Sequence, residues 1–190
     1  MDNKTKILDS ALELFHARGY DSVGVQEIAE MAGVTKPALY YYFGNKQGLL
    51  STLLNLKYEE MKTAVFGNLD ECKDFRQRLT RVAGAYLDYA GTNRKSYLLI
   101  MAMFYSAKEN EAYQSVKPIV RDFYQRMVGL FEDAWEQLGN MRGRQEQFAL
   151  GFTGLLDHYI LLESQKSEIQ KIPEEVKEGL IQQFLYGIYT

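Results

Sequence analysis

The chain contains few of the residues that build disulfides, metal sites and membrane spans. Its 190 residues include one cysteine, Cys72, which excludes an internal disulfide and is consistent with a reducing cytoplasm. No apolar run reaches the roughly 18 residues that a membrane-spanning helix needs. The N-terminal segment lacks the features of a signal peptide. The sequence therefore predicts a cytoplasmic protein without a membrane partner.

Residues that carry catalysis are also scarce. The only histidines are His16 and His158, and the spacing of Glu13 and His16 matches just one half of a di-iron bundle motif. Cys72 has no histidine near it in the sequence, and no glycine-rich phosphate loop is present. We therefore predict that the protein is not an enzyme and that it holds no metal ion and no cofactor.

An excess of basic residues is missing as well. The formal net charge is −3, and residues 1–62 contain seven Lys or Arg against eight Asp or Glu. A protein that binds nucleic acid mainly by neutralising phosphates would be basic. Any DNA binding should therefore depend on a few focused contacts, with weak non-specific binding and a shallow dependence on salt.

Residues 24–46 indicate two short helices joined by a tight turn. Ile28 and Ala32 lie on one apolar face of the first helix. Gly33 can end that helix, because glycine accepts the left-handed backbone common at helix C-termini. Thr35 is suited to cap the second helix. This arrangement is typical of an element that places one helix in the major groove of DNA.

The second helix of this segment is crowded with tyrosines. Leu39 and Phe43, four residues apart, are expected to face the core, and the residues that face outward or flank that face are Lys36, Ala38, Tyr40, Tyr41 and Tyr42. Tyrosine suits DNA, because its hydroxyl bonds phosphate and its ring packs on sugar or a thymine methyl. Asn45 can cap the next helix at Lys46, which would form a phosphate seat. The alternative is an ordinary helical hairpin whose tyrosines are half-buried against a neighbour.

The N-terminal segment carries a pattern of paired apolar, glycine and aromatic residues over about residues 4–58. These residues are Ile7-Leu8, Ala11-Leu12, Leu14-Phe15, Gly19-Tyr20, Ile28-Ala29, Ala32-Gly33-Val34, Leu39-Tyr40, Tyr42-Phe43, Lys46 and Leu49-Leu50. The pattern resembles that of the tetracycline-repressor-type (TetR/AcrR) transcriptional regulators. Two positions depart from the family pattern: Gly24 replaces the usual Ser or Thr cap, and Gly48 replaces a helix former. These departures concern local stability rather than DNA contacts.

The resemblance implies which residues contact operator DNA. Lys36 would lie near the bases and could donate to guanine, while Gln26 would reach a base edge or the backbone. The tyrosines and Lys46 would mainly grip phosphates. The implied DNA-binding residues are Gln26, Thr35, Lys36, Pro37, Ala38, Tyr40, Tyr41, Tyr42 and Lys46.

The remainder of the chain has a helical pattern, with no alternating strand pattern anywhere. We expect helices over about 46–65, 74–90, 94–106, 112–138, 142–165 and 174–188. Pro118 should kink or restart one of them, and Pro173 should be the first residue of the last. The prediction is an all-α protein with a three-helix helix-turn-helix DNA-binding domain over 1–46 and a helical effector-binding and dimerisation domain over 47–190.

An aromatic and methionine-containing stripe runs through this second domain. It could line an apolar pocket with hydroxyls for orientation, or it could simply fill the core. The resemblance favours a pocket for a hydrophobic or aromatic small molecule, because members of that family usually sense one there. The predicted ligand-binding residues are Tyr86, Tyr89, Tyr97, Met101, Phe104, Phe123, Met127, Phe152 and Tyr159.

Two faces of the 148–162 segment carry apolar residues, which suggests burial on both sides. Small residues permit a close helix crossing, and in the resembling family the last two helices form a four-helix interface between subunits. His158 would form a hydrogen-bonded interface pair, or would anchor ligand or sense pH. The predicted homodimer contacts are Gly151, Gly154, His158, Leu161, Leu180, Phe184 and Ile188.

The sequence thus predicts a homodimeric, ligand-responsive transcriptional regulator, a repressor, that binds a palindromic double-stranded operator. Ligand in the second domain would shift the helix that starts near Lys46 and release the DNA. The alternatives are a helical small-molecule or lipid carrier, a scaffold protein, an activator, and a DNA-binding factor without a small effector.

Overall fold

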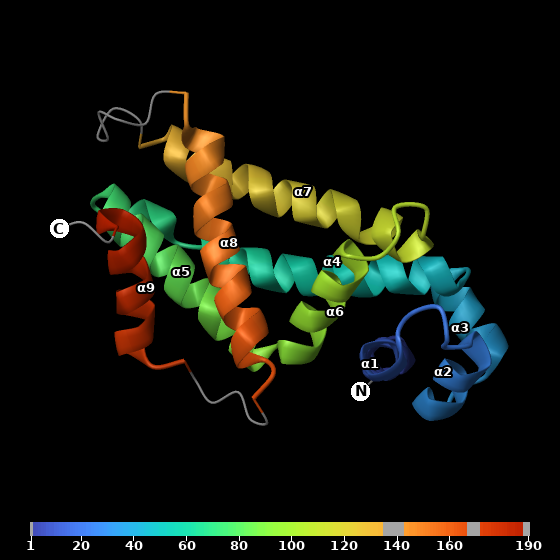
Figure 1. Cartoon of the computed structure of the whole chain (residues 1–190). Coiled ribbons are helices and arrows are strands. Elements are labelled where there is room, and N and C mark those ends of the chain that lie inside the picture. The colour runs from blue at the N-terminus through green and yellow to red at the C-terminus, as the bar shows by residue number, and fades with distance from the viewer. Residues whose placement is uncertain (1, 135–142, 167–171, 188–190) are drawn as a thin grey trace. The chain divides into compact units, whose positions relative to one another are not determined.

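The computed structural model describes residues 2–134, 143–166 and 172–187 (Figure 1). Across these ranges the chain forms nine α-helices and one short 3-10 helix, with no strand, so the all-α prediction is confirmed. None of these helices is long and apolar enough to cross a membrane. The elements are α1 (Asn3–Arg18), α2 (Val25–Ala32), α3 (Lys36–Phe43), α4 (Lys46–Phe66), η1 (Leu69–Glu71), α5 (Phe75–Thr92), α6 (Arg94–Phe104), α7 (Glu111–Glu132), α8 (Gln145–Glu163) and α9 (Glu174–Tyr186).

The chain divides into two compact units, each made of two segments. The N-terminal unit comprises Met1–Glu59 and Lys95–Val120, and the C-terminal unit comprises Glu60–Arg94 and Arg121–Thr190. The divisions fall inside α4 and inside α7, and just after the first residue of α6. The predicted domain boundary after residue 46 stays a prediction.

In the N-terminal unit, α1 packs against α2 and α3. The Oδ1 atom of Asp2 accepts a hydrogen bond from the Thr5 N–H at 2.7 Å and so caps α1. The buried face of α1 includes Ile7, Ala11 and Phe15. This helix therefore provides a buried apolar face in the unit that contains the two short helices.

The C-terminal unit has an aromatic core in which α5, α7, α8 and α9 meet. The ring of Phe131 lies 5.3 Å from that of Phe75 and 6.1 Å from those of Phe152 and Phe184. Such tilted and edge-to-face pairs are the favoured aromatic arrangements. The helices of this unit are thus held together by contacts between residues far apart in the sequence.

Three features of the helices differ from the sequence-based expectations. Helix α7 continues through Pro118 without a break, and α5 extends to Thr92, beyond its expected end at about residue 90. Pro173 is the N-cap of α9 rather than its first residue, and its carbonyl accepts hydrogen bonds from two N–H groups of the first turn. The predicted helix end near residues 138–139 lies outside the described residues, as does the predicted dimer contact Ile188.

Candidate nucleic-acid interface

The turn between α2 and α3 is fixed by a left-handed glycine. Gly33 has φ 65° and ψ 34°, a region that residues with a Cβ atom adopt at a cost. Its N–H donates to the carbonyls of Ala29 and Glu30, and the Val34 N–H donates to the carbonyl of Ala29 at 2.9 Å. These bonds satisfy the last carbonyls of α2 and turn the chain directly into α3.

Helix α3 is held by its cap and by two buried side chains. The Oγ1 atom of Thr35 accepts a hydrogen bond from the Ala38 N–H at 3.3 Å, and Pro37 lies in the first turn. Leu39 is fully buried and Phe43 is 8% exposed. The predicted cap and the predicted core face of this helix are both confirmed.

The opposite side of α3 is an exposed tyrosine face, formed by Tyr40, Tyr41 and Tyr42. Tyr41 is 85% exposed, and the other two are 40% and 41% exposed. The ammonium group of Lys36, which is also exposed, lies 5.7 Å from the centre of the Tyr40 ring. The expected outward orientation of these residues is confirmed, and their contact with DNA stays a prediction.

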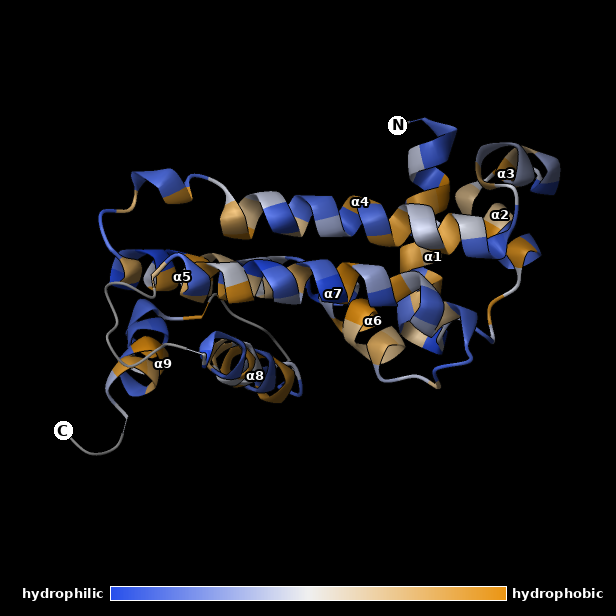
Figure 2. Ribbon diagram, turned by 90° about the horizontal axis from the view of Figure 1, so that it is seen from above, coloured by the Kyte–Doolittle hydropathy of each residue, from blue (hydrophilic) through white to orange (hydrophobic). Residues whose placement is uncertain are grey.

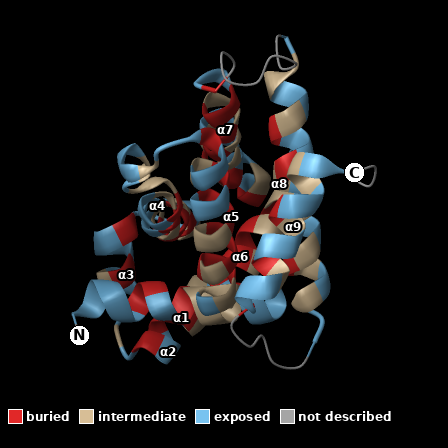
Figure 3. Ribbon diagram, turned by 90° about the vertical axis from the view of Figure 1, so that its left-hand side faces the viewer, coloured by how far each residue is buried: buried red, intermediate tan, exposed pale blue. Residues whose placement is uncertain are grey.

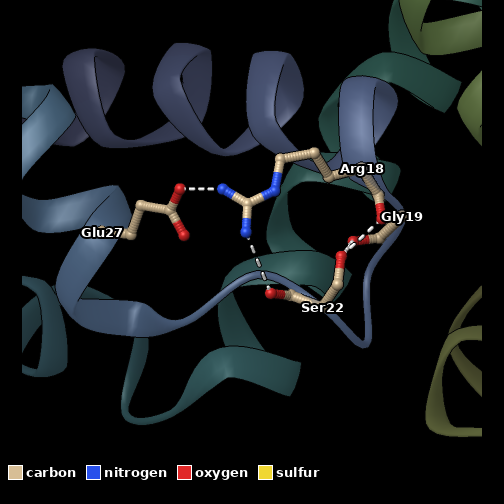
Figure 4. Close-up of polar contacts among 4 residues, drawn as sticks. All are labelled: Arg18, Gly19, Ser22 and Glu27. Carbon is tan, nitrogen blue, oxygen red and sulfur yellow. Dashed lines mark hydrogen bonds and ion pairs between the residues drawn. The ribbon is translucent and has the colours of Figure 1, made fainter.

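Arg18 joins the end of α1 to the first turn of α2 (Figure 4). Its guanidinium pairs with the Glu27 carboxylate and donates to the Ser22 carbonyl. The hydroxyl of Ser22 donates to the carbonyls of Arg18 and Gly19, so it closes the end of α1 instead of capping α2. The N-cap of α2 is Gly24, which has no side-chain hydrogen bond.

Gln26 of the predicted interface and the predicted cap Asn45 both have hydrogen-bond partners close by in the sequence. Gln26 is exposed in the first turn of α2, and its amide donates to Glu30 at 2.7 Å. At the start of α4, the Oδ1 atom of Asn45 accepts a hydrogen bond from the Gly48 N–H at 2.7 Å, which confirms the predicted cap.

The structure explains why position 48 is a glycine, which the sequence alone did not. A Cβ atom at this position would lie 2.1 Å from the carbonyl oxygen of Phe43, much closer than any real contact. The chain enters α4 so soon after α3 that only glycine fits here. The glycine therefore fixes the path between the tyrosine-bearing helix and α4.

Lys46 lies over the ring of Tyr20, with its ammonium nitrogen 4.1 Å from the ring centre. Burial lowers the pKa of Lys46, and the negative charges of Asp21 and Glu111 oppose that effect. The Tyr20 hydroxyl donates to Glu111 at 2.9 Å; burial, this hydrogen bond and the nearby carboxylates raise the pKa of Tyr20. Glu111 was absent from the sequence-based set, because only the fold brings α7 to this point.

The predicted ligand-binding residues fall in both compact units. Tyr97, Met101 and Phe104 belong to the N-terminal unit and the other six belong to the C-terminal unit. Tyr86 stacks on Phe123 with ring centres 5.0 Å apart and donates to Asp157 at 2.6 Å. The buried members of the set are Tyr86, Tyr89, Tyr97, Phe123, Met127 and Phe152, and the partly exposed ones are Met101, Phe104 and Tyr159. Six of them therefore contribute to the packed interior, and their role in ligand binding stays a prediction.

Helices α8 and α9, which carry the predicted dimer contacts, each contain buried, intermediate and exposed residues (Figure 3). Gly151, Gly154 and His158 are exposed, and Leu161 and Leu180 are partly exposed. Phe184 instead packs its ring 4.9 Å from that of Phe152. The same side of α8 exposes two further leucines, Leu150 at 64% and Leu162 at 52%.

Among the residues that the structure describes, no group of three or more His, Cys, Asp and Glu side chains is placed to hold a metal ion.

Residues 7–53 match the model of the bacterial regulatory proteins of the tetR family. Over these residues, which run from α1 into α4, the chain is similar to that family. A curated relative, the HTH-type transcriptional activator FasR of Mycolicibacterium smegmatis, is 33% identical over 113 residues. That match covers 60% of this chain and 52% of FasR, so the chain spans about half the length of that relative.

Two solved structures share the fold over almost the whole chain. The regulator FadR from Bacillus subtilis, in complex with stearoyl-CoA, has a TM-score of 0.80 at 19% identity and covers 97% of this chain and 99% of its own. AibR, in complex with isovaleryl coenzyme A and operator DNA, has a TM-score of 0.75 at 20% identity and covers 96% of this chain and 97% of its own. These likenesses concern the fold alone.

Proposed function

We propose that this protein is a transcriptional regulator of the tetR type that binds operator DNA through α3. The observation that carries the proposal is the exposed tyrosine face of that helix. Three adjacent tyrosines and Lys36 are exposed to solvent. Leu39 and Phe43 are buried and hold the other side of the helix in the core. Tyrosine hydroxyls and a lysine ammonium are suited to phosphates and to base edges in the major groove.

The regulator acts as a homodimer on a two-fold-symmetric operator. Support comes from the outer side of α8, where Leu150 and Leu162 are exposed beside two glycines that would allow a close helix crossing. A dimer would place its two copies of α3 in successive major grooves, about 34–36 Å apart for half-sites one helical turn apart.

The effector is a hydrophobic small molecule, and acyl-CoA thioesters are the first class to test. FadR and AibR, which share this fold, were solved with stearoyl-CoA and isovaleryl coenzyme A respectively. Binding would act through α4, whose residues belong partly to each compact unit and whose first residue is Lys46. A coupling free energy of about 1–3 kcal/mol is enough to release DNA in a repressor.

The first experiment is selection of bound duplexes from a random DNA pool, followed by affinity measurements on the recovered sequence. An inverted repeat is expected. Lys36→Ala and Tyr41→Ala should each weaken binding by tenfold or more, which corresponds to about 1.4 kcal/mol. The matched controls, Lys117→Ala and Tyr105→Ala, remove exposed residues of the same types away from α3 and should bind normally. Normal binding by both α3 variants would place the reading face elsewhere.

A second candidate function is activation instead of repression, favoured by the name of the relative FasR. Adding isovaleryl-CoA and stearoyl-CoA to the preformed DNA complex distinguishes the two. Release of the DNA indicates a repressor, tighter binding indicates an activator that requires the ligand, and no effect of either compound contradicts the proposed effector class. If no duplex is enriched although the protein is folded and dimeric, the carrier or scaffold function replaces the proposal.

A further inference from the structure

The N-terminal unit contains a cleft of about 420 Å³ that the predicted ligand residues do not line. One wall comes from the end of α1 and the turn that follows it, and the other comes from α6 and the turn before α7. Helix α6 is among the most hydrophobic segments of the chain (Figure 2). Phe15, Leu99 and Met103 form a buried apolar floor.

One end of this cleft is polar and rich in hydrogen-bond acceptors. Asp21 lines it and uses one carboxylate oxygen to accept from the Asn110 amide at 2.8 Å, which leaves the other oxygen for a ligand. The Ser106 hydroxyl donates to the Met103 carbonyl, so its lone pairs are also available. A molecule with N–H donors would therefore find partners here.

The charge at this end is negative. The carboxylates of Asp21 and Glu111 both lie near the ammonium group of Lys46, which is held over the Tyr20 ring. His16 also lines the cleft and is exposed. The net charge favours a cation over an anion.

We propose that this cleft is a binding site for a small organic ammonium compound with an aromatic or apolar body. The body lies on the Phe15, Leu99 and Met103 floor, and the ammonium group donates to Asp21 and Ser106. A volume of about 420 Å³ is within the range of small-molecule pockets. The ligand of this cleft is a cation, whereas the proposed acyl-CoA effector is an anion.

A ligand in the cleft would touch both α1 and α6. The Glu13–Lys95 ion pair at 2.6 Å links α1 to α6, and the Asp21–Asn110 hydrogen bond links the turns that follow these two helices. Filling the space between them would bias the position of α1, on which α2 and α3 pack. Any resulting change in DNA affinity rests on the proposed function, whereas ligand binding itself does not.

The test uses tryptamine as the probe, with 3-ethylindole and indole-3-propionate as neutral and anionic controls of the same shape. Binding to the full-length protein is followed by NMR of ¹³C-labelled methionine methyl groups. The Met103 methyl lines the cleft and should shift saturably, while the Met127 methyl, buried in the C-terminal unit, should not move. Tryptamine should bind at least fivefold more tightly than either control.

Two variants locate the site. Asp21→Asn keeps an acceptor for Asn110 but removes the charge, so it should weaken tryptamine binding at least threefold and leave 3-ethylindole unchanged. Ala102→Trp fills the exposed side of the cleft and should weaken binding of tryptamine tenfold or more, whereas Ala17→Trp, on an exposed position of α1 that does not line the cleft, should not. Binding that ignores both Asp21→Asn and Ala102→Trp, a shift of Met127 without Met103, equal binding of the three compounds, or no saturable binding would each overturn the proposal.

The effect of tryptamine on DNA affinity is measured separately from the binding of tryptamine itself. If the selected operator binds with equal affinity with and without saturating tryptamine, the site stands and its regulatory role falls. If the protein selects no DNA but the Met103 shifts follow the expected pattern, the site stands and the proposed function falls.

Discussion

At the residue scale, two glycines determine how α3 is connected to the helices before and after it. Gly33 supplies the left-handed turn before it, and Gly48 allows α4 to start beside the carbonyl of Phe43. The left-handed Gly33 could be predicted, because glycine at a helix C-terminus has a local signal. The need for glycine at position 48 could not, because it arises from a contact that exists only once α3 and α4 are placed.

Replacing Gly48 with alanine should destabilise the protein despite the higher helix propensity of alanine. The added Cβ would overlap the Phe43 carbonyl, and we expect a loss of about 1–3 kcal/mol, as for other overpacked positions. The measurement is urea unfolding followed by circular dichroism.

The matched control is Gly84→Ala in the middle of α5, where a Cβ atom meets nothing within 4 Å. This change should stabilise the protein by up to about 1 kcal/mol, because only propensity is altered. If the two substitutions have effects of the same sign, the close approach at Gly48 does not govern the path into α4.

Replacing Gly24 with serine should stabilise the protein. Gly24 caps α2 without a side-chain bond, its φ of −90° and ψ of 151° suit any residue, and a Cβ there meets nothing within 4 Å. Gly24→Ser should let the hydroxyl accept from the N–H of Glu27, a gain of a few tenths of a kcal/mol. The gain would appear as a small rise in Tm, and a fall in Tm would show that the Arg18–Glu27 pair competes with the new cap.

At the element scale, the helices themselves were predictable and their partners were not. Apolar periodicity gave the bounds of α4 and α9 to within about two residues, because amphipathic spacing is a local property. The contacts that join Tyr20 to Glu111 and Lys177 to Asp88 each span about ninety residues, and nothing in the local sequence pairs them. The tyrosine face of α3 was predictable because motif and periodicity agreed there.

Lys177 of α9 donates a hydrogen bond to Asp88 of α5, and this contact should contribute to the free energy of unfolding. Its ammonium donates to Asp88 and to Glu174 at 2.7 Å, with the side chain only 3% exposed. Lys177→Ala removes two charge-assisted hydrogen bonds and the packing of the stem, and we expect a loss of about 1.5–3 kcal/mol. Urea unfolding at pH 7 measures it, and the exposed Lys117→Ala should stay within about 0.5 kcal/mol of the parent.

The contacts of Lys177 also predict how the free energy of unfolding depends on pH. Burial disfavours the charged form of this lysine, but the hydrogen bonds that it donates to Asp88 and Glu174 outweigh that effect and raise the pKa of Lys177. A raised folded-state pKa means that the stabilisation is complete below the unfolded value, near 10.4, and is lost as pH rises through the folded-state value. The stability difference between parent and Lys177→Ala should therefore be constant from pH 6 to about 10 and shrink only above the unfolded value. A difference that grows with alkaline pH would contradict this assignment.

At the scale of the whole molecule, DNA binding must come from an acidic chain. With a formal charge of −3, the protein has no general attraction for phosphates, so two lysines per subunit, Lys36 and Lys46, should provide most of the ionic contacts. Four neutralised phosphates per dimer correspond to a slope of about −4 in a plot of log K against log salt concentration. Lys46→Gln should reduce that slope by about 2, because one phosphate contact is lost per subunit.

The slope is measured by fluorescence anisotropy on the selected operator between 50 and 300 mM KCl, with Lys117→Gln as the control. A parent slope near −10, or a Lys46→Gln slope equal to that of the parent, would mean that lysines other than these carry the phosphate contacts and that Lys46 serves the Tyr20 ring alone.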